Sequence, residues 1–314
     1  MNVAVYGVGG VGGYFGAQLA RAGVDVRMIA RGDHLRAIRD KGLCITSPNG
    51  EMLVQPSMAT DDPAEVGIVD VIILGVKADQ VRSVAETLSP MIGKDSFVLP
   101  LQNGVEAAGE LVDVLGPQHV IGGLCGIMSW VSGPGHIRTL GDVNFIRLGE
   151  LDNAQSERVE SFRSLLESAG VKAEIPDDVH EALWEKFLFV ASIGGIGAVR
   201  RAPFGAIRED PESRRMLELA MREIFNLAIS AGISLDESIV ERTLGFADEL
   251  PAEGTTSLQR DIVAGRPSEL DAWSGAVVRL AAKTGVEVPV HSFIYDTLLP
   301  LDLASRSQAD DKIV

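Results

Sequence analysis

A glycine-rich segment close to the N-terminus has the spacing of a dinucleotide-binding loop. The segment consists of Gly7, Val8, Gly9, Gly10, Val11 and Gly12. It follows a short apolar run and opens a helical pattern, which is the context in which G-x-G-x-x-G binds a pyrophosphate. Gly7 permits the tight turn, Gly9 lets the backbone approach the phosphates, and Gly12 lets helix and strand pack closely. We therefore expect these six residues to bind a dinucleotide at the start of a helix, in preference to a glycine turn that binds nothing.

The residue after the second apolar run decides between the two nicotinamide dinucleotides. An NAD site places Asp or Glu about 20 residues beyond the motif, where it accepts hydrogen bonds from the ribose. Residues 28–32 read MIARG, with Arg31 in place of the acid. A carboxylate would repel a 2′-phosphate, whereas a guanidinium binds it through charge-assisted hydrogen bonds worth roughly 1.5–3 kcal/mol each. Arg31 therefore predicts NADP(H) as the cofactor. The alternatives are a solvated loop arginine and an inward-turned carboxylate at the neighbouring Asp33.

Two polar residues follow apolar runs further along the same half of the chain. Lys77 comes directly after Val69–Val76, and Asn103 follows Phe97–Leu101. In open parallel sheets, ligands bind at the carboxyl ends of the strands. A lysine there offers a positive charge to a ribose or a substrate, and an asparagine amide can bond a carboxamide or a carbonyl. The alternatives are a surface lysine at a helix start and a turn-forming asparagine before Gly104.

Lys186 is the candidate proton donor in the second half. It opens an apolar run that begins at Phe187. It is therefore either desolvated, which makes it readier to give up a proton, or directed outward to water. A salt bridge with Glu185 or another acid is the alternative. Ser257 and Glu269 begin two further helical patterns, where a serine and a first-turn carboxylate also occur for purely structural reasons.

Hydrophobic periodicity divides the chain into an α/β half and an all-helical half. Residues 1–176 alternate strands and helices, which predicts a Rossmann-type domain with a doubly wound parallel sheet. The predicted strands are Asn2–Tyr6, Val24–Ala30, Val69–Val76 and Phe97–Leu101, with helices running through Ala22 and over Val105–Leu115. Between Val120 and Gly149, strand-like pieces are separated by predicted hairpin turns at residues 133–135 and 141–142. Residues 177–314 predict an all-α domain with helices at Asp178–Val199, Pro211–Ala231, Leu235–Leu250, Thr256–Ala264, Ser268–Thr284 and Val290–Leu303.

Composition narrows the classes of partner. The 314 residues include 28 Lys and Arg and 44 Asp and Glu, a net charge of −16. Because such a surface repels phosphates, we expect neither nucleic acid nor an anionic membrane as a partner. The apolar run Phe187–Val199 is shorter than the ~20 residues that a bilayer needs. The first residues also lack the basic region of a signal peptide. We therefore expect a cytoplasmic protein. Cys44 and Cys125 are expected to be buried and reduced, and five scattered histidines predict no metal site.

The ordered set of motifs resembles the ketopantoate reductases (2-dehydropantoate 2-reductases), NADPH-dependent enzymes of pantothenate synthesis. The resemblance runs over nearly the whole chain. It rests on the glycine motif, Arg31, Lys77, Gln102-Asn103-Gly104, Leu183-Trp184-Glu185-Lys186, Ser257-Leu258-Gln259-Arg260-Asp261 and Gly265-Arg266-Pro267-Ser268-Glu269-Leu270-Asp271.

The resemblance implies roles for the candidate residues. Lys186 would be the general acid that protonates the C2 oxygen of a 2-keto acid as NADPH delivers hydride to C2. Glu269 would bond that oxygen and steady the lysine, and Ser257 would bind the substrate carboxylate. Asn103 would contact both substrate and cofactor, and the cofactor would also contact Lys77 and Glu269. Apolar helical faces in the second half fit either a core or a homodimer interface.

Three positions depart from the family pattern. Val190 and Gly194 stand where family members carry asparagines one and two turns after the lysine, and Trp273 precedes Ser274-Gly275 where Asn-Gly is common. Each lost hydrogen bond would cost roughly 0.5–1.5 kcal/mol of substrate binding. We expect the reduction of ketopantoate to pantoate. A sister reductase for another 2-keto acid is the first alternative and a non-catalytic NADP(H) sensor the second, although a sensor has no need of both Lys186 and Glu269.

Overall fold

The computed structural model describes residues 1–310, and for Asp142, Ala309 and Asp310 it describes the backbone alone. The chain forms two compact units. The first contains residues 1–102 and 107–182, so it extends beyond Pro176 into the first turn of a long helix. The second contains the chain from Leu183 onward together with the four residues Asn103–Glu106.

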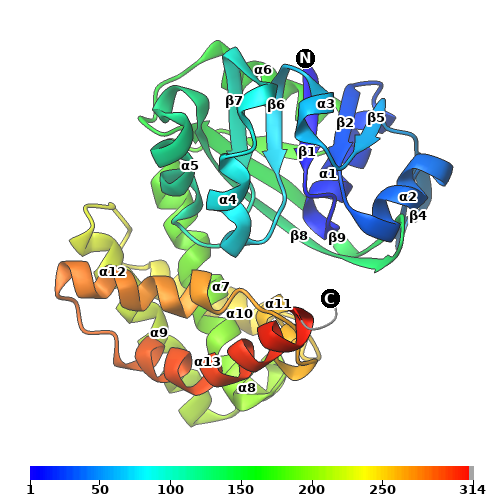
Figure 1. The fold of residues 1–314 in the computed structure, drawn as a ribbon. Helices are drawn as coiled ribbons and strands as arrows, with labels where there is room; N and C mark the ends of the chain where they lie inside the picture. The colour runs from blue at the N-terminus through cyan, green and yellow to red at the C-terminus, as the bar shows by residue number, and fades with distance from the viewer. Residues whose placement is uncertain (311–314) are drawn as a thin grey trace. The chain divides into compact units, whose positions relative to one another are not determined.

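A five-stranded parallel sheet forms the centre of the first unit, in the order β5-β2-β1-β6-β7 (Figure 1). This order confirms the predicted doubly wound arrangement. The strands are β1 (Asn2–Tyr6), β2 (Asp25–Ile29), β5 (Met58–Thr60), β6 (Val69–Leu74) and β7 (Ile92–Pro100). The helices of this unit are α1 (Gly10–Arg21), α2 (Gly32–Lys41), α3 (Pro63–Val66), α4 (Val81–Ala85), α5 (Ala107–Leu115) and α6 (Glu157–Ser168), with 3-10 turns at Ala78–Gln80, Ser89–Met91 and Pro117–His119.

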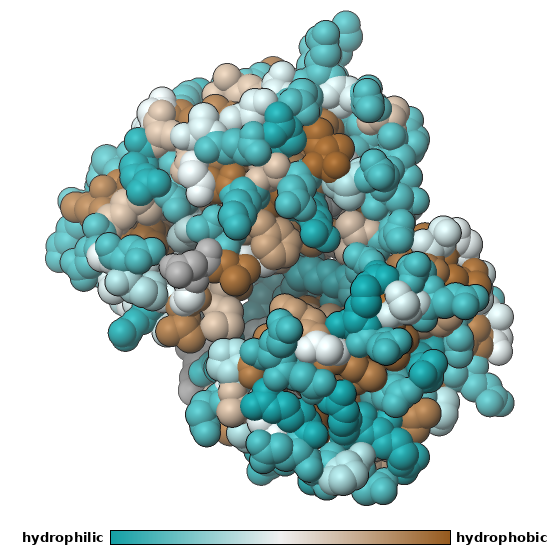
Figure 2. Space-filling view, turned by 180° about the vertical axis from the view of Figure 1, so that it is seen from behind, coloured by the Kyte–Doolittle hydropathy of each residue, from teal (hydrophilic) through white to brown (hydrophobic). Residues whose placement is uncertain are grey.

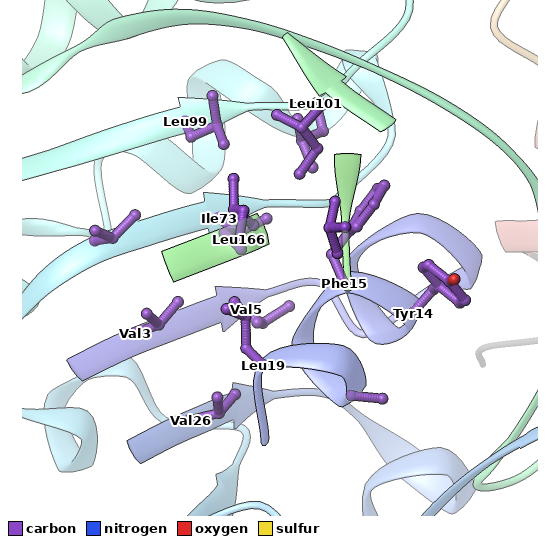
Figure 3. Packing of buried hydrophobic residues seen from close by; sticks show 14 of the residues in the cluster. Val3, Val5, Tyr14, Phe15, Leu19, Val26, Ile73, Leu99, Leu101 and Leu166 are labelled. Carbon is purple, nitrogen blue, oxygen red and sulfur yellow. The ribbon is translucent and has the colours of Figure 1, made fainter. Parts of the chain in front are cut away.

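Both faces of this sheet are covered by apolar clusters. Val3 and Val5 of β1 belong to one cluster, and Ala4 and Tyr6 belong to another, because successive side chains of a strand point to opposite faces. Figure 3 shows the first cluster, in which Phe15 and Leu19 of α1 lie over the strands. Burial on both faces explains why these strands have continuous apolar sequences with no alternation of polar residues.

A second sheet packs against α1 in the same unit. It consists of β3 (Leu43–Ser47), β4 (Gly50–Val54), β8 (Ile121–Gly133), β9 (His136–Glu150) and β10 (Lys172–Glu174). The hairpin turn predicted around residues 133–135 joins β8 to β9. The turn predicted at residues 141–142 is wrong. Residues 141–143 form a bulge inside β9, since Met128 pairs with Leu140 while Ile127 pairs with Asn144, and Gly141 supplies the left-handed φ of +73°.

The regular elements of the second unit are all helices among its described residues, as the sequence predicts. Its elements are α7 (Val179–Arg200, whose first turn lies in the first unit), α8 (Phe204–Glu209), α9 (Pro211–Ser230), α10 (Ile239–Glu249), α11 (Ser257–Val263), a π-helical turn (Asp271–Gly275, hereafter the π turn), α12 (Ala276–Thr284) and α13 (Pro289–Asp310). The helix predicted over Ser268–Thr284 is confirmed from Asp271 onward, where the π turn leads directly into α12, but residues 268–270 are irregular. The helix predicted from Leu235 begins only at Ile239.

By length and composition alone, helix α7 is long and apolar enough to cross a membrane. Two thirds of its most apolar stretch is buried inside the protein, which is typical of a core helix. Hydrophilic residues cover most of the surface seen in Figure 2, and apolar side chains lie among them in small patches. Cys44 and Cys125 are both buried, as predicted.

Candidate active site

The glycine loop between β1 and α1 is shaped by close backbone contacts. Gly7 has φ +91°, and a Cβ there would lie 2.7 Å from the backbone nitrogen of Val76. A Cβ on Gly12 would lie 2.3 Å from the carbonyl oxygen of Gly7, so helix and loop meet without a side chain between them. A Cβ on Gly9, in contrast, would meet no neighbouring atom nearer than 3.9 Å. The loop is therefore closed at Gly7 and Gly12 and open at Gly9, next to the first N–H groups of α1, which suits a dinucleotide phosphate.

Two further glycines let the β8–β9 hairpin approach the start of α1. A Cβ on Gly10 would lie 2.6 Å from the Ser129 carbonyl oxygen, and one on Gly13 would lie 2.2 Å from Cδ1 of Ile137. The glycine motif predicts a cofactor contact at Gly10, and this packing is an additional reason for a glycine at that position. The extra glycines Gly10 and Gly13 are a sequence sign of a close backbone approach, but the residues that approach them are more than 110 positions away in the chain.

A cavity of about 260 Å³ lies beside the glycine loop. It is lined by Tyr6, Gly7, Val8, Ile29, Ala30, Arg31, His34, Val76, Gln80, Ser83 and Val84. The structure thus brings Arg31 together with the first residues of the motif. Lys77 is not part of the lining, although it follows Val76 directly and precedes the 3-10 turn Ala78–Gln80.

Arg31 occupies the N-cap position of α2 and is exposed. Asp33, whose direction the sequence left open, pairs with Arg36 one turn along the same helix. Its carboxylate does not line the cavity. The cavity wall therefore carries a cation, and no acid is among its lining residues.

His34 also lines the cavity, although no motif in the sequence marks it. Its Nδ1 accepts a hydrogen bond of 3.0 Å from the Gly135 N–H at the β8–β9 turn. Burial lowers the pKa of His34 below its ordinary value, so the ring is neutral near pH 7 and can keep this acceptor role. The histidine thereby ties the first turn of α2 to the hairpin beside the glycine loop.

In the second unit, the Asn103–Glu106 segment is held against the π turn. Gly104 has φ +116°, and a Cβ there would lie 3.1 Å from the Ala272 carbonyl oxygen. Glu106 forms an ion pair of 2.8 Å with Arg279, which also pairs with Asp271 at 2.8 Å. The positive φ agrees with a turn at Asn103-Gly104, and the ion pairs fix that turn to the helical unit.

Lys186, Val190 and Gly194 are spaced four residues apart on α7 and therefore share one face. Lys186 and Val190 are half-buried. Glu185, proposed as a salt-bridge partner for Lys186, pairs with Arg242 at 3.2 Å. At Gly194 a Cβ would lie 2.4 Å from the Trp273 ring, so the indole occupies the space that a side chain at position 194 would need.

Gly194 is the point at which the candidate catalytic segments meet. The Thr256 hydroxyl, which caps α11 by accepting the Gln259 N–H, lies 3.5 Å from the Cβ position of Gly194. Ser257 is the next residue and the first of α11. Glu269 precedes the π turn, and its carbonyl oxygen accepts the N–H of Trp273 at 3.1 Å. Helix α7, the start of α11 and the segment of Glu269 therefore converge around one glycine.

Comparison with known proteins identifies a family that has this combination of a nucleotide-binding loop and a helical unit. The family described as "Ketopantoate reductase PanE/ApbA" matches residues 3–153, and its C-terminal domain matches residues 178–301. The chain belongs to the ketopantoate reductase family. It is therefore an oxidoreductase of the 2-dehydropantoate 2-reductase type, and the expectation drawn from its motifs is confirmed at this level.

Individual relatives agree with the family assignment. The chain is 29% identical to a 2-dehydropantoate 2-reductase of Nostoc sp. over 97% of its own length and 96% of that protein. It is 31% identical to one of Mesorhizobium japonicum over 89% and 91% of the two chains. A ketopantoate reductase structure from Ralstonia eutropha superimposes with a TM-score of 0.89 at 29% identity, covering 98% of this chain and 100% of that one. A D-mandelate dehydrogenase solved with NADH and anilino(oxo)acetate shares the fold at 22% identity, with a TM-score of 0.88 over 98% and 100% of the two chains.

The functional groups present at the candidate site limit the chemistry that it can perform. Among the side chains that the structure describes, no group of His, Cys, Asp and Glu could hold a metal ion. The glycine loop with its open position at Gly9 and the cavity at Arg31 fit a nicotinamide dinucleotide, as the family membership implies. The helical unit contributes an amine, a carboxylate, a hydroxyl and an amide from Lys186, Glu269, Ser257 and Asn103.

Proposed function

We propose that this protein reduces 2-dehydropantoate to pantoate with NADPH. One observation carries the proposal: the segments that contain Lys186, Ser257 and Glu269 meet within one unit. The segment of Asn103 belongs to the same unit and is held against the π turn. Those residue types, in that order along the chain, supply an acid and the binding groups that a 2-keto acid needs.

The reaction adds a hydride and a proton across the C2 carbonyl. When bound, the reduced nicotinamide supplies the hydride to C2. The Lys186 ammonium donates a proton to the carbonyl oxygen as negative charge develops there, which leaves an amine, a hydroxyl group and an oxidised nicotinamide. Glu269 accepts a hydrogen bond from the new hydroxyl and keeps Lys186 oriented. Ser257 and Asn103 bind the carboxylate and the carbonyl, so the keto group meets the donor at about 2.6–3.2 Å.

The preference for NADPH rests on Arg31. The guanidinium at the cavity wall would form charge-assisted hydrogen bonds with the 2′-phosphate. Lys77, Gly7, Val8 and the other residues of the glycine loop complete the proposed cofactor site. A homodimer and a cytoplasmic location stay predictions, and sedimentation of the purified chain would test the former.

The test is a comparison of substrates with purified protein. NADPH oxidation is followed with ketopantoate and with a panel of 2-keto acids, and ketopantoate should give the highest kcat/KM. Tight NADPH binding with no turnover of any keto acid would instead favour a sensor and contradict the proposal.

A second candidate is a reductase of an apolar 2-keto acid. It is favoured by the face of α7 beyond Lys186, where the Val190 side chain is apolar and carbon atoms of the Trp273 ring cover Gly194. If ketopantoate is the substrate, Val190→Asn should lower its KM with little change in kcat, because ground and transition states gain alike. A higher kcat/KM for 2-keto acids with apolar side chains in the wild type would decide for the second candidate.

A further inference from the structure

A buried carboxylate on the last helix lies directly behind the segment that carries Glu269. One oxygen of Asp302 accepts hydrogen bonds from the backbone N–H and from the hydroxyl of Ser268, at 2.7 and 2.6 Å. The other oxygen accepts from Arg306 at 2.7 Å, and Arg306 also donates to the Ser268 carbonyl at 2.7 Å. Asp302 is 2% exposed and Ser268 is 1% exposed, so water competes weakly for these bonds.

These bonds fix the chain on both sides of Glu269. Before it, the N–H, hydroxyl and carbonyl of Ser268 are all bonded to α13. After it, the Leu270 N–H donates to the Ser268 hydroxyl at 3.3 Å. The glutamate therefore belongs to a short irregular segment whose backbone has little freedom, although no helix or strand encloses it.

The contacts continue along one face of α13. His291, Tyr295 and Asp302 are four and seven residues apart, a spacing that places side chains on a common helix face. Their partners are Ser274, Asp271 and Ser268, with the Tyr295 hydroxyl donating to Asp271 at 2.8 Å. Helix α13 thus holds the whole stretch from Ser268 through the π turn.

We propose that Asp302 is a positioning residue, which holds the Glu269 carboxylate in its working place through Ser268 and Arg306. The inference rests on the proposed role of Glu269. Asp302 and Arg306 both lie beyond residue 301, where the match to the C-terminal family domain ends.

The chain offers a matched control for the experiment. At the start of α9, Asp210 accepts hydrogen bonds from the N–H and hydroxyl of Ser213, at 3.0 and 2.6 Å, and pairs with Arg200 at 3.0 Å. In both clusters an aspartate accepts from a serine N–H and hydroxyl and pairs with an arginine, although the Asp210 side chain is 36% exposed and that of Asp302 only 3%. The Asp210 cluster caps α9 and holds none of the candidate catalytic residues. Asp302→Asn and Asp210→Asn therefore each remove one negative charge from a serine–arginine cluster of the second unit.

The variants are compared with Glu269→Ala in kcat, in KM for the keto acid, in the pH profile of kcat and in thermal melting. A misplacement of about 1 Å can cost about 100-fold in rate, so Asp302→Asn should lose about 10- to 100-fold in kcat/KM. Its pH profile should shift in the same direction as that of Glu269→Ala. Asp210→Asn should lower the melting temperature yet keep kcat/KM within about twofold.

Because Asp302→Asn removes a buried charge and could prevent folding, the serine provides a milder pair. Ser268→Ala loses the hydroxyl and should show the same kinetic defect, while Ser268→Thr keeps it and should recover most of the activity. Ser213→Ala is the control.

The outcomes separate the two proposals. If Glu269→Ala is impaired while Asp302→Asn and Ser268→Ala behave like their controls, the positioning role is refuted. If Glu269→Ala itself turns over like the wild type, the proposed role of Glu269 is wrong, and the positioning inference is withdrawn with it.

Discussion

Alanine substitutions at Gly9 and Gly12 should separate cofactor binding from folding within one loop. Gly9 is the N-cap of α1 with φ −81° and ψ −164°, a conformation open to any residue, and a Cβ there would have 3.9 Å of room. Gly9→Ala should thus cost at most about 1 kcal/mol as a poorer helix cap. At Gly12 a Cβ would lie 2.3 Å from a carbonyl oxygen, so the backbone must move, at a cost of about 2–3 kcal/mol.

These costs translate into different measurements. Each kcal/mol lowers the melting temperature of a protein of this size by about 2–4 °C, so Gly12→Ala should lose about 5–10 °C and Gly9→Ala only a few degrees. In Gly9→Ala the new methyl occupies the open position where a phosphate would approach. NADPH titrated by fluorescence should therefore bind at least about tenfold more weakly, a loss of about 1.4 kcal/mol.

Gly109→Ala is the control, because that glycine lies in α5 with no atom within 4 Å of its Cβ position. It should bind NADPH like the wild type. The reasoning about the open position is refuted if Gly9→Ala also binds NADPH with unchanged affinity.

The remaining predictions concern the proton donor, the cofactor and a buried histidine. Lys186→Ala should lower kcat by about 10²–10⁴-fold with NADPH affinity unchanged. Lys283 is an exposed lysine on α12, and Lys283→Ala should keep the wild-type kcat. If Lys186→Ala retains more than about a tenth of the turnover, the proton comes from elsewhere. NADPH should bind at least tenfold more tightly than NADH, and Arg31→Ala should remove most of that difference; equal affinities in the wild type would contradict the assignment of Arg31. Burial lowers the pKa of His291 to about 4, so the unfolded chain takes up a proton between pH 6.5 and 4 while the folded chain does not. Stability should therefore fall by about 3 kcal/mol as the pH falls through that window, and urea unfolding should show a weaker pH dependence in His291→Asn.

The parts of the fold that the sequence predicts are those whose signal is local. The run VDVIILGV at residues 69–76 is apolar at nearly every position because β6 is buried on both faces, and the glycine motif stands between a strand and a helix as its chemistry requires. At residues 141–143 the pair Gly141-Asp142 predicts a turn where the chain forms a bulge, because a glycine with positive φ is suited to both.

The parts of the site that the sequence missed depend on distant partners. Ser268 was predicted to start a helix, because a serine before acidic residues is a common helix start. Its backbone bonds instead go to Asp302, 34 residues later, and nothing local marks that pairing. Trp273 precedes Ser274-Gly275, where the family pattern has Asn-Gly, but its packing on Gly194 depends on the meeting of α7 and the π turn.

Because Asn103–Glu106 belongs to the helical unit, this segment folds late while the chain is being synthesised. Glu106 and its partner Arg279 are 173 residues apart. At about 5–20 residues per second, the ribosome needs roughly 10–30 s to make the interval between them. The parallel sheet can close in that time, because all its strands precede residue 101. The Asn103 turn must wait for the helical half, so a nascent or truncated chain has its sheet complete well before this turn reaches its final place.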